Sequence, residues 1–367
     1  MKKRVAILGA TGSIGKNALD VIAQKKDDFE LVLLSAHNKI EELAELCRQW
    51  PNARTVLSNG EEGRKSLLDA IAGCGADITL NGIAGSAGLA PSMAALEAGS
   101  DLALANKETL VMAGSLVIQK AKEKNVNIIP VDSEHSAIFH LIKAHGRESL
   151  DEIILTASGG PFRNYSVEEM AAVNPRAALA HPTWNMGPKI SIDSASMANK
   201  GLEVIEAAVL FNLPSEKIKV LIHPQSIVHS MIHMNDGAIY AQLSRPDMRL
   251  PIHKALYWPE TSPSDLERLD FNALTLEFFL PDTQKFPLLT YAYEVVNKGS
   301  LFPCAFNSAN EAAVAAFLNG RITFPEISRV THNVLDTDWS AAPENISQVL
   351  EADKQAKEIA EEIIRNR

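Results

Sequence analysis

The stretch that decides the fold opens the chain: Arg4-Val5-Ala6-Ile7-Leu8-Gly9-Ala10-Thr11-Gly12-Ser13-Ile14-Gly15. The short apolar run that ends at Gly9 predicts a strand, and the residues from Ser13 onward predict a helix. Glycines between a strand and a helix permit a tight turn, and they let a pyrophosphate approach the backbone at the positive end of the helix. The sequence therefore predicts a nucleotide-binding turn to which Thr11 and Ser13 can add hydroxyl donors.

The first 131 residues continue this alternation of strands and helices. Alternation of this kind predicts a parallel sheet with helices on both faces, that is, a Rossmann-like domain over residues 1–131. The expected strands are Arg4–Leu8, Phe29–Ser35, Ile78–Asn81, Asp101–Ala105 and Val126–Pro130, and the first two expected helices are Ser13–Gln24 and Ile40–Gln49.

The pattern changes after Asp132. Asn235-Asp236-Gly237 lies between two alternating runs and predicts a β-hairpin, so residues 132–260 are expected to form a central α+β domain. Four prolines from Pro246 to Pro263 and the irregular stretch to Pro287 predict a connection, with a linker over 261–287. Residues 288–367 are expected to form a C-terminal helical domain. Its predicted helices are Leu288–Asn297, Ser308–Asn319, Pro325–Val334 and Ser347–Arg365.

Composition limits the function. The chain has 367 residues and a formal net charge of −10, which argues against a nucleic-acid surface but allows an anionic metabolite. It has no apolar stretch long enough to span a bilayer, so we expect no membrane partner. Three widely spaced cysteines favour a reducing, cytoplasmic location.

The second strand bears on the choice of nucleotide. An NAD-binding chain usually places an acid there for the ribose 2′-hydroxyl, whereas this strand runs into His37-Asn38-Lys39. These residues could contact a 2′-phosphate, which favours NADPH. An exposed loop without any cofactor contact is the alternative.

Asp132 and Glu134 follow the predicted strand that ends at Pro130. In an extended chain both carboxylates would share one face, and Mg²⁺ or Mn²⁺ prefers such oxygen ligands. Glu203 is a candidate third carboxylate, but spacing does not decide whether it joins the pair. Solvated carboxylates are one alternative, and a zinc site at His229 and His233 is another, for which cross-strand packing is the simpler explanation.

The stretch 184–203 combines hydroxyls, an amide, an ammonium and a carboxylate with Trp184 and Met186. Packing alone does not need this composition, whereas a site for a phosphorylated, oxygen-rich molecule beside a metal ion does. Trp184 stands among prolines and a glycine, which predicts a loop rather than a core position.

Taken together, these segments resemble the 1-deoxy-D-xylulose 5-phosphate reductoisomerase family of the non-mevalonate isoprenoid pathway. The matching segments are 9–15, Ala105-Asn106-Lys107-Glu108, 130–135, Ser158-Gly159-Gly160-Pro161-Phe162-Arg163, 181–203, His223-Pro224-Gln225-Ser226 and Pro246-Asp247-Met248-Arg249. The resemblance implies an NADPH- and Mg²⁺- or Mn²⁺-dependent homodimer that rearranges the sugar phosphate by retro-aldol and aldol steps. Hydride reduction then gives 2-C-methyl-D-erythritol 4-phosphate.

The resemblance also implies roles for individual residues. Lys107, Asp132, Glu134 and Glu203 would be catalytic, the three acids as metal ligands. The substrate would meet Lys107, Ser133, Glu134, Ser158, His181, Trp184, Met186, Ser194, Asn199, Lys200 and Glu203. NADPH would meet Thr11, Gly12, Ser13, Ile14, His37, Asn38, Lys39, Asn106, Glu108 and Gly187. Trp184 and Met186 would lie on a mobile loop near 181–190.

Two other functions stay open. Another NADP-dependent oxidoreductase is the first. A short-chain dehydrogenase would need a tyrosine with a lysine four residues later, and a semialdehyde dehydrogenase would need a reactive thiolate, but no tyrosine and no cysteine here has such a setting. A non-catalytic NADP sensor needs only the Rossmann-like part. The set Asp132, Glu134, Lys200 and Glu203 argues against a sensor, which has no use for a metal chelate.

Overall fold

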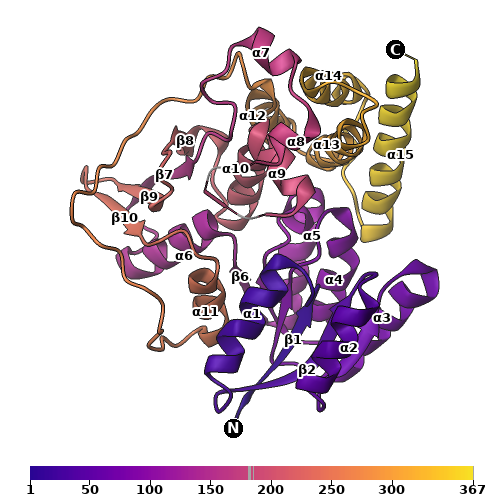
Figure 1. Cartoon of the computed structure of the whole chain (residues 1–367), viewed down its shortest axis with the longest axis vertical. Coiled ribbons are helices and arrows are strands. Elements are labelled where there is room, and N and C mark those ends of the chain that lie inside the picture. The colour runs from indigo at the N-terminus through magenta and orange to yellow at the C-terminus, as the bar shows by residue number, and fades with distance from the viewer. Residues whose placement is uncertain (181–182, 185, 367) are drawn as a thin grey trace. The chain divides into compact units, whose positions relative to one another are not determined.

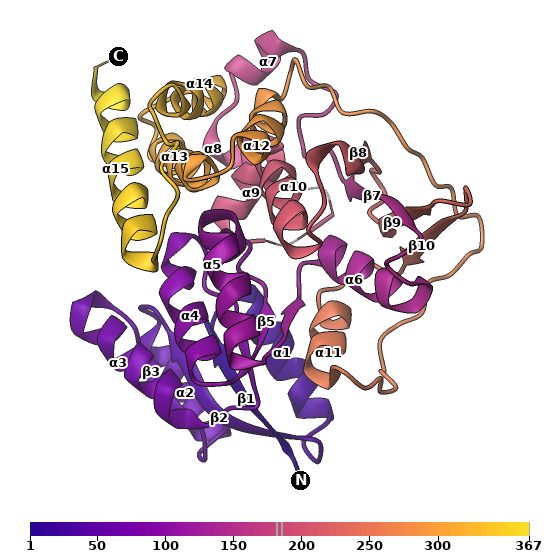
Figure 2. The same ribbon diagram turned by 180° about the vertical axis from the view of Figure 1, so that it is seen from behind.

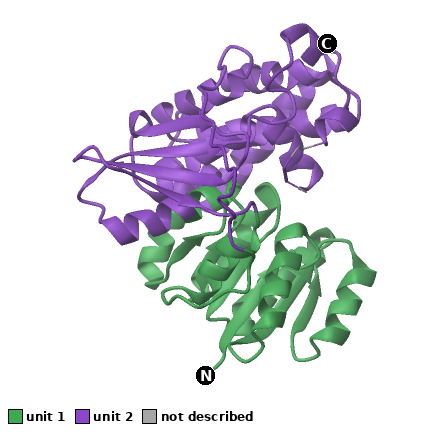
Figure 3. Ribbon diagram, turned by 60° about the vertical axis from the view of Figure 1, so that its left-hand side comes forward, with its two compact units in different colours: residues 1–109, 115–136, 247–267 green, residues 110–114, 137–246, 268–367 purple. Residues whose placement is uncertain are grey.

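The computed structural model describes residues 1–180, 183–184 and 186–366. They divide into two compact units, coloured in Figure 3. Unit 1 comprises residues 1–109, 115–136 and 247–267, and unit 2 comprises 110–114, 137–246 and 268–367. Among the described residues, no helix is both long enough and apolar enough to cross a membrane.

Unit 1 contains a six-stranded sheet in the order β3-β2-β1-β4-β5-β6, and every neighbouring pair is parallel. The predicted Rossmann-like domain is confirmed. The strands are β1 (Lys3–Leu8), β2 (Phe29–Ala36), β3 (Arg54–Leu57), β4 (Ile78–Asn81), β5 (Asp101–Leu104) and β6 (Ile128–Pro130). The chain order reverses between β1 and β4, and ligands of such sheets bind beyond the carboxyl ends of the strands at this position.

Helices cover both faces of this sheet. Figure 1 shows α1 on one face, and Figure 2 shows α4 and α5 on the other. The helices are α1 (Ser13–Gln24), α2 (Ile40–Gln49), α3 (Gly60–Cys74), the 3₁₀ turn η1 (Ser86–Gly88), α4 (Leu89–Glu97), α5 (Glu108–Lys124) and α11 (Arg249–Tyr257). The inner strands β1, β4 and β5 and the short β6 are largely buried, as the apolar runs of a parallel sheet require, whereas only Val56 of the edge strand β3 is buried.

Unit 2 contains a four-stranded mixed sheet in the order β10-β9-β7-β8. Its strands are β7 (Leu150–Ala157), β8 (Ile218–Ile222), β9 (Val228–Met234) and β10 (Ile239–Leu243). The predicted hairpin is confirmed: β9 and β10 pair antiparallel, and Gly237 has a φ of +90° in the turn. β7 and β8 are parallel, so this part is α+β.

The rest of unit 2 is mainly helical. Its helices are most of α6 (Ser133–His145), then α7 (Val167–Ala171), α8 (Pro175–Ala178), α9 (Pro188–Ala195), α10 (Ala198–Leu210), the 3₁₀ turn η2 (Ser215–Lys217), α12 (Pro287–Lys298), α13 (Phe302–Leu318), α14 (Phe324–Leu335) and α15 (Ile346–Arg365). α13 is buried along most of its length and packs against α14 and α15. The C-terminal helical part is therefore confirmed, although α13 begins six residues before its predicted start.

Two local predictions are wrong. The proline-rich stretch after Pro246 is not an irregular connection throughout, because α11 forms there with Pro251 in its first turn, where a missing N–H costs no hydrogen bond. Asp132 and Glu134 are not in an extended chain, because α6 begins at Ser133. α11 groups with unit 1, whereas the predicted domains assign it to the central part. The three-domain division remains a proposal.

Candidate functional site

The glycine turn follows β1 as predicted. Gly9 has a φ of +81°, which L residues rarely adopt, and a Cβ on Gly15 would lie 2.4 Å from the Gly9 carbonyl oxygen. Gly12 caps α1 without a side-chain hydrogen bond, so the first N–H groups of the helix remain available to an anion. Thr11 is buried, Ile14 is half-buried, and Gly12 and Ser13 are exposed at the turn.

His37, Asn38 and Lys39 form an exposed loop after β2. Lys39 reaches the glycine turn, because its Nζ donates to the Thr11 carbonyl oxygen over 3.5 Å. Lys39 and Lys16 both pair with Glu42, at 2.9 and 2.8 Å. Hydrogen bonds from these two ammonium groups lower the pKa of the Glu42 carboxyl. The loop therefore places the Lys39 ammonium beside the turn, and Lys16 of α1 adds a second cation, which would suit a 2′-phosphate.

Asn106 and Lys107, between β5 and α5, and Glu108, the first residue of α5, are buried. Asn106 donates from its amide to Glu108 over 2.8 Å and to the Gly85 carbonyl over 2.9 Å. The Lys107 ammonium forms a buried ion pair with Asp132. An ammonium that is 5% exposed needs such a partner, because the cost of burying an unpaired charge is large.

Asp132 and Glu134 come together at the start of α6 by a route other than the predicted one. The Asp132 carbonyl accepts from the Ser136 N–H over 2.8 Å, so Asp132 stands at the helix start and Glu134 lies in the first turn. Carboxylate oxygens of the two residues lie within 4.8 Å of each other. Ser133 is buried and donates to Glu134. The acidic pair is therefore formed by the residue that precedes α6 and one in its first turn, whereas an extended chain was expected to give it.

In unit 2, Asn199, Lys200 and Glu203 share one face of α10. Glu203 is fully buried; its Oε1 accepts from Asn199 over 2.6 Å, and its Oε2 pairs with the Lys200 ammonium. The predicted helical neighbours are therefore correct. The side chains of this set can hold anionic oxygens and a cation at neighbouring positions.

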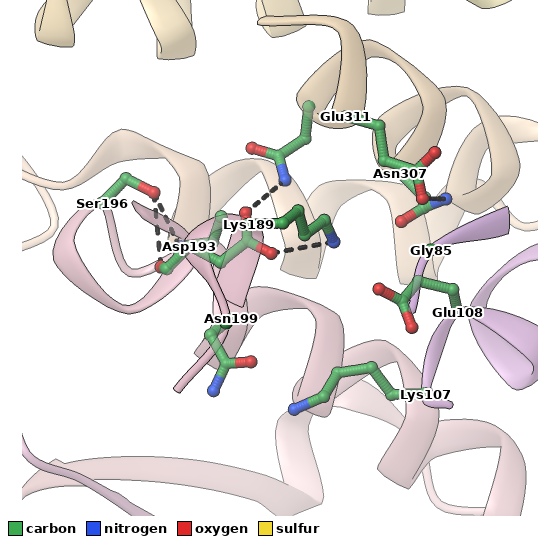
Figure 4. A network of polar contacts seen from close by, with 12 residues as sticks. Gly85, Lys107, Glu108, Lys189, Asp193, Ser196, Asn199, Asn307 and Glu311 are labelled. Carbon is green, nitrogen blue, oxygen red and sulfur yellow. Dashed lines mark hydrogen bonds and ion pairs between the residues drawn. The ribbon is translucent and has the colours of Figure 1, made fainter. Parts of the chain in front are cut away.

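Ser194 lies near the end of α9, and the turn that follows Ser158 packs against it. Gly160 has a φ of +68°, and its Cβ position would be 2.7 Å from the Ser194 carbonyl oxygen. α9 is anchored by Asp193, which sequence reasoning missed. Figure 4 shows Lys189 and Asp193 directed toward one another. The Asp193 carboxylate pairs with Lys189 at 2.8 Å and accepts from Asn310 of α13 at 2.7 Å.

The chain before α9 carries the remaining predicted substrate contacts. His181 lies outside the described residues. Trp184 is half-buried in irregular chain, which agrees with its predicted loop position, and Met186 is also half-buried. Gly187 is exposed and precedes α9 as its N-cap.

His229 was assigned to cross-strand packing, yet its ring centroid lies 6.5 Å from that of Trp184. Its Nε2 shares a hydrogen bond with Ser244 Oγ over 2.7 Å, and His233 lies 3.4 Å from Glu152. These contacts give the two histidines partners other than a zinc ion. The alternation of β9 places His229 on the face that it shares with the half-buried Met231 and His233, so it gives no sign that His229 is buried or that Trp184 lies beside it.

Comparison with known proteins places this chain in a family. Residues 128–211 match the "1-deoxy-D-xylulose 5-phosphate reductoisomerase C-terminal domain", and residues 243–359 match the "DXP reductoisomerase C-terminal domain". Residues 5–67 and 52–114 match "1-deoxy-D-xylulose 5-phosphate reductoisomerase". The reductoisomerase of Treponema denticola is 47% identical over 98% of this chain and 96% of its own. The chain belongs to the 1-deoxy-D-xylulose 5-phosphate reductoisomerase family.

Other members of the family agree. The Treponema pallidum reductoisomerase is 44% identical, covering 100% of this chain and 98% of its own. A reductoisomerase structure from Zymomonas mobilis, in complex with NADPH, is 41% identical with a TM-score of 0.92, and the match covers 99% of both chains. A DOX-P reductoisomerase structure with NADPH, fosmidomycin and magnesium is 35% identical with a TM-score of 0.91, covering 99% of this chain and 98% of that one. The fold resemblance thus covers both units.

Proposed function

We propose that this chain converts 1-deoxy-D-xylulose 5-phosphate into 2-C-methyl-D-erythritol 4-phosphate, with NADPH as reductant and Mg²⁺ or Mn²⁺ as cofactor. The observation that carries the proposal is the fully buried Glu203 carboxylate with Lys200 and Asn199 on one face of α10, in a member of the reductoisomerase family. A buried acid, ammonium and amide together suit a metal ion beside an oxygen-rich anion.

Asp132, Glu134 and Glu203 are the proposed metal ligands. Carboxylate oxygens are the donors that Mg²⁺ and Mn²⁺ prefer, and the proximity of Asp132 to Glu134 fits a cation because two neighbouring carboxylates otherwise repel each other. When bound, the metal supplies Lewis acidity that orients the ketone and a neighbouring hydroxyl of the substrate.

The protein's own groups hold the substrate. Lys107 and Ser133 would contact the oxygens at the reacting carbons, where a carbon–carbon bond breaks and re-forms before hydride reduces the resulting aldehyde. Lys200 and Asn199 would hold anionic oxygens as charge-assisted donors. Ser158, Ser194 and His181 complete the proposed phosphate contacts, and the packing of the Ser158 turn on α9 supports the first two.

The proposed NADPH contacts are in unit 1. The pyrophosphate would lie against the turn formed by Thr11, Gly12, Ser13 and Ile14, where α1 begins. Lys39, with Asn38 and His37, would contact the 2′-phosphate, and the reach of Lys39 to Thr11 supports this. Asn106 and Glu108 would face the nicotinamide side, and Gly187 would approach the cofactor from the loop.

Trp184 and Met186 are proposed to belong to a loop near 181–190 that covers the substrate and excludes water. Half-burial of both residues in irregular chain supports such a role. A cysteine-based oxidoreductase is disfavoured for the buried thiol of Cys304, because burial raises its pKa to about 12 and a thiolate is the nucleophile.

A homodimer is the proposed assembly. In unit 2, β10 is an edge strand, and Ile239 and Tyr240 on it are 56% and 38% exposed. Phe279 and Leu280, after the irregular chain that follows α11, are 53% and 82% exposed. An open strand edge with exposed apolar side chains suits a second copy of the chain. Light scattering should give twice the chain mass, and Leu280→Glu should weaken the dimer.

A cytoplasmic location is also proposed, since all three cysteines are unpaired.

The test of the proposed reaction is NADPH oxidation with 1-deoxy-D-xylulose 5-phosphate. Purified protein is first treated with a chelator, and turnover is then followed at 340 nm with and without added Mg²⁺. We expect oxidation only when substrate and metal are both present, and 2-C-methyl-D-erythritol 4-phosphate as the product. Equal turnover without metal, or no turnover with every component present, would contradict the proposal.

A further inference from the structure

A chain of buried side-chain hydrogen bonds runs through unit 1 from the end of β4 to the start of α5. Asn81 Nδ2 donates to Ser92 Oγ over 2.7 Å, and Ser92 Oγ lies 3.0 Å from Thr109 Oγ1. Thr109 Oγ1 donates to Asn106 Oδ1 over 2.6 Å, and Asn106 Nδ2 donates to Glu108 over 2.8 Å. Asn81, Ser92 and Thr109 are completely buried and Asn106 is 2% exposed, so the chain is sealed from solvent.

The direction of every bond in this chain is fixed. The Asn81 amide is oriented at both ends, because Nδ2 also donates to the Gly88 carbonyl and Oδ1 accepts from the Ile83 N–H. At the other end, the Asn106 amide nitrogen must face the Gly85 carbonyl and the Glu108 carboxylate, which only accept.

The two hydroxyls have no freedom between these fixed amides. The Thr109 hydroxyl donates its hydrogen bond to Asn106 Oδ1, so the Ser92 hydroxyl must donate to Thr109 Oγ1. Ser92 Oγ in turn accepts from Asn81 Nδ2. Hydrogen bonds that all run in one direction polarise and strengthen one another. A buried group that loses its partner in such a series has no water to replace that partner, so the loss is costly.

This series of hydrogen bonds ends at Asn106 and Glu108, the two residues that flank Lys107. Asn106 precedes Lys107 and Glu108 follows it, so fixing both side chains holds the backbone from which Lys107 reaches Asp132. We propose that Thr109 and Ser92 are positioning residues that set Lys107 and Glu108 for the reaction. This inference rests on the proposed function, in which Lys107 meets the substrate and Glu108 faces NADPH.

The test replaces one hydroxyl by a methyl group of similar volume. Thr109→Val removes the donor to Asn106 and the acceptor for Ser92, whereas Thr109→Ser keeps the hydroxyl. The matched control is Thr79→Val, because Thr79 on β4 is equally buried and its hydroxyl forms a 2.9 Å bond with Ser100 outside this chain. Turnover, the KM for the sugar phosphate and NADPH affinity by nicotinamide fluorescence are measured for all three variants.

We expect Thr109→Val to lower kcat by about tenfold or more and to weaken NADPH binding, since small displacements of reacting groups have large kinetic effects. Thr109→Ser should restore both, and Thr79→Val should lose stability while keeping wild-type kinetics. Ser92→Ala serves as a second disrupting variant if Thr109→Val does not fold. Wild-type kinetics in Thr109→Val, or equal impairment in Thr109→Ser and Thr109→Val, would overturn the inference.

Failure of the proposed function would look different. In that case the wild-type protein itself would not turn over, whereas NADPH affinity would still distinguish Thr109→Val from Thr79→Val if the hydroxyl chain sets Glu108. Equal NADPH affinity in these two variants would then overturn the positioning role by itself.

Discussion

Gly88→Ala is the sharpest perturbation of the loop that carries Lys107. Gly88 has a φ of −75° and a ψ of −18°, so alanine suits the backbone, and in most settings the change would stabilise the protein. Here the added Cβ would lie 2.3 Å from Asn106 Oδ1 and 2.8 Å from Nδ2. Ordinary contact begins at 3.4 Å, so the amide must retreat by 3.4 − 2.3, about 1.1 Å.

That displacement exceeds the margin to 3.5 Å of the hydrogen bonds which now measure 2.6, 2.9 and 2.8 Å, so it is large enough to break each of them. At about 1 kcal/mol for each buried bond, the loss is about 3 kcal/mol. Alanine also lowers the conformational entropy of the unfolded chain, which stabilises the folded protein by about 0.4–1 kcal/mol. The net destabilisation is then about 2 kcal/mol. A shift of about 1 Å beside Lys107 should also lower kcat by about 10- to 100-fold.

Urea unfolding and steady-state NADPH oxidation measure the two effects. Gly73→Ala is the control, since Gly73 lies on the exposed side of α3 with nothing within 4 Å of its Cβ position. It should raise the free energy of unfolding by about 0.4–1 kcal/mol and leave kcat unchanged. If Gly88→Ala behaves like Gly73→Ala in both assays, the contact with Asn106 is not the one described and the reasoning fails.

Three further variants test the proposed roles. Glu203→Gln should nearly abolish turnover at saturating Mg²⁺ while NADPH affinity stays close to wild type, and wild-type turnover at limiting metal would refute the ligand role. Lys39→Ala should reduce the preference for NADPH over NADH by about tenfold, measured as the ratio of kcat/KM values; an unchanged ratio would remove Lys39 from the 2′-phosphate site. Trp184→Ala should raise the KM for the sugar phosphate and lower kcat together, whereas a loss of thermal stability alone would indicate a packing role.

Local sequence signals were enough for the Rossmann-like part. The run ending at Leu8 and the three glycines after it predict strand, turn and helix from local residues, because glycine readily adopts the φ of Gly9 and permits the close approach at Gly15. The hairpin at Gly237 is equally local. The prediction of an irregular connection around Pro251 was wrong, because proline is common both in loops and in the first turn of a helix, and the sequence does not distinguish the two.

The acidic pair shows that two carboxylates can lie together, as predicted, on a local structure other than the predicted one. Asp132 and Glu134 were expected on one face of an extended chain, but α6 starts between them, and their carboxylate oxygens still lie within 4.8 Å of each other. The residue types alone left solvated carboxylates as an alternative to a metal site, and the resemblance to the family favoured the metal site. The sequence did not identify the backbone that carries the two carboxylates.

Tertiary structure alone decided the partners of the buried polar groups. Nothing in the sequence links Asn310 to Asp193 across 117 positions, or Ser92 to Thr109 and His229 to Trp184. Serine, threonine and asparagine occur in loops and in cores alike, so their spacing carries no signal of burial. Repeating apolar residues and glycines report local backbone shape, whereas a buried hydroxyl acquires its function only when the folded chain brings its partner to it.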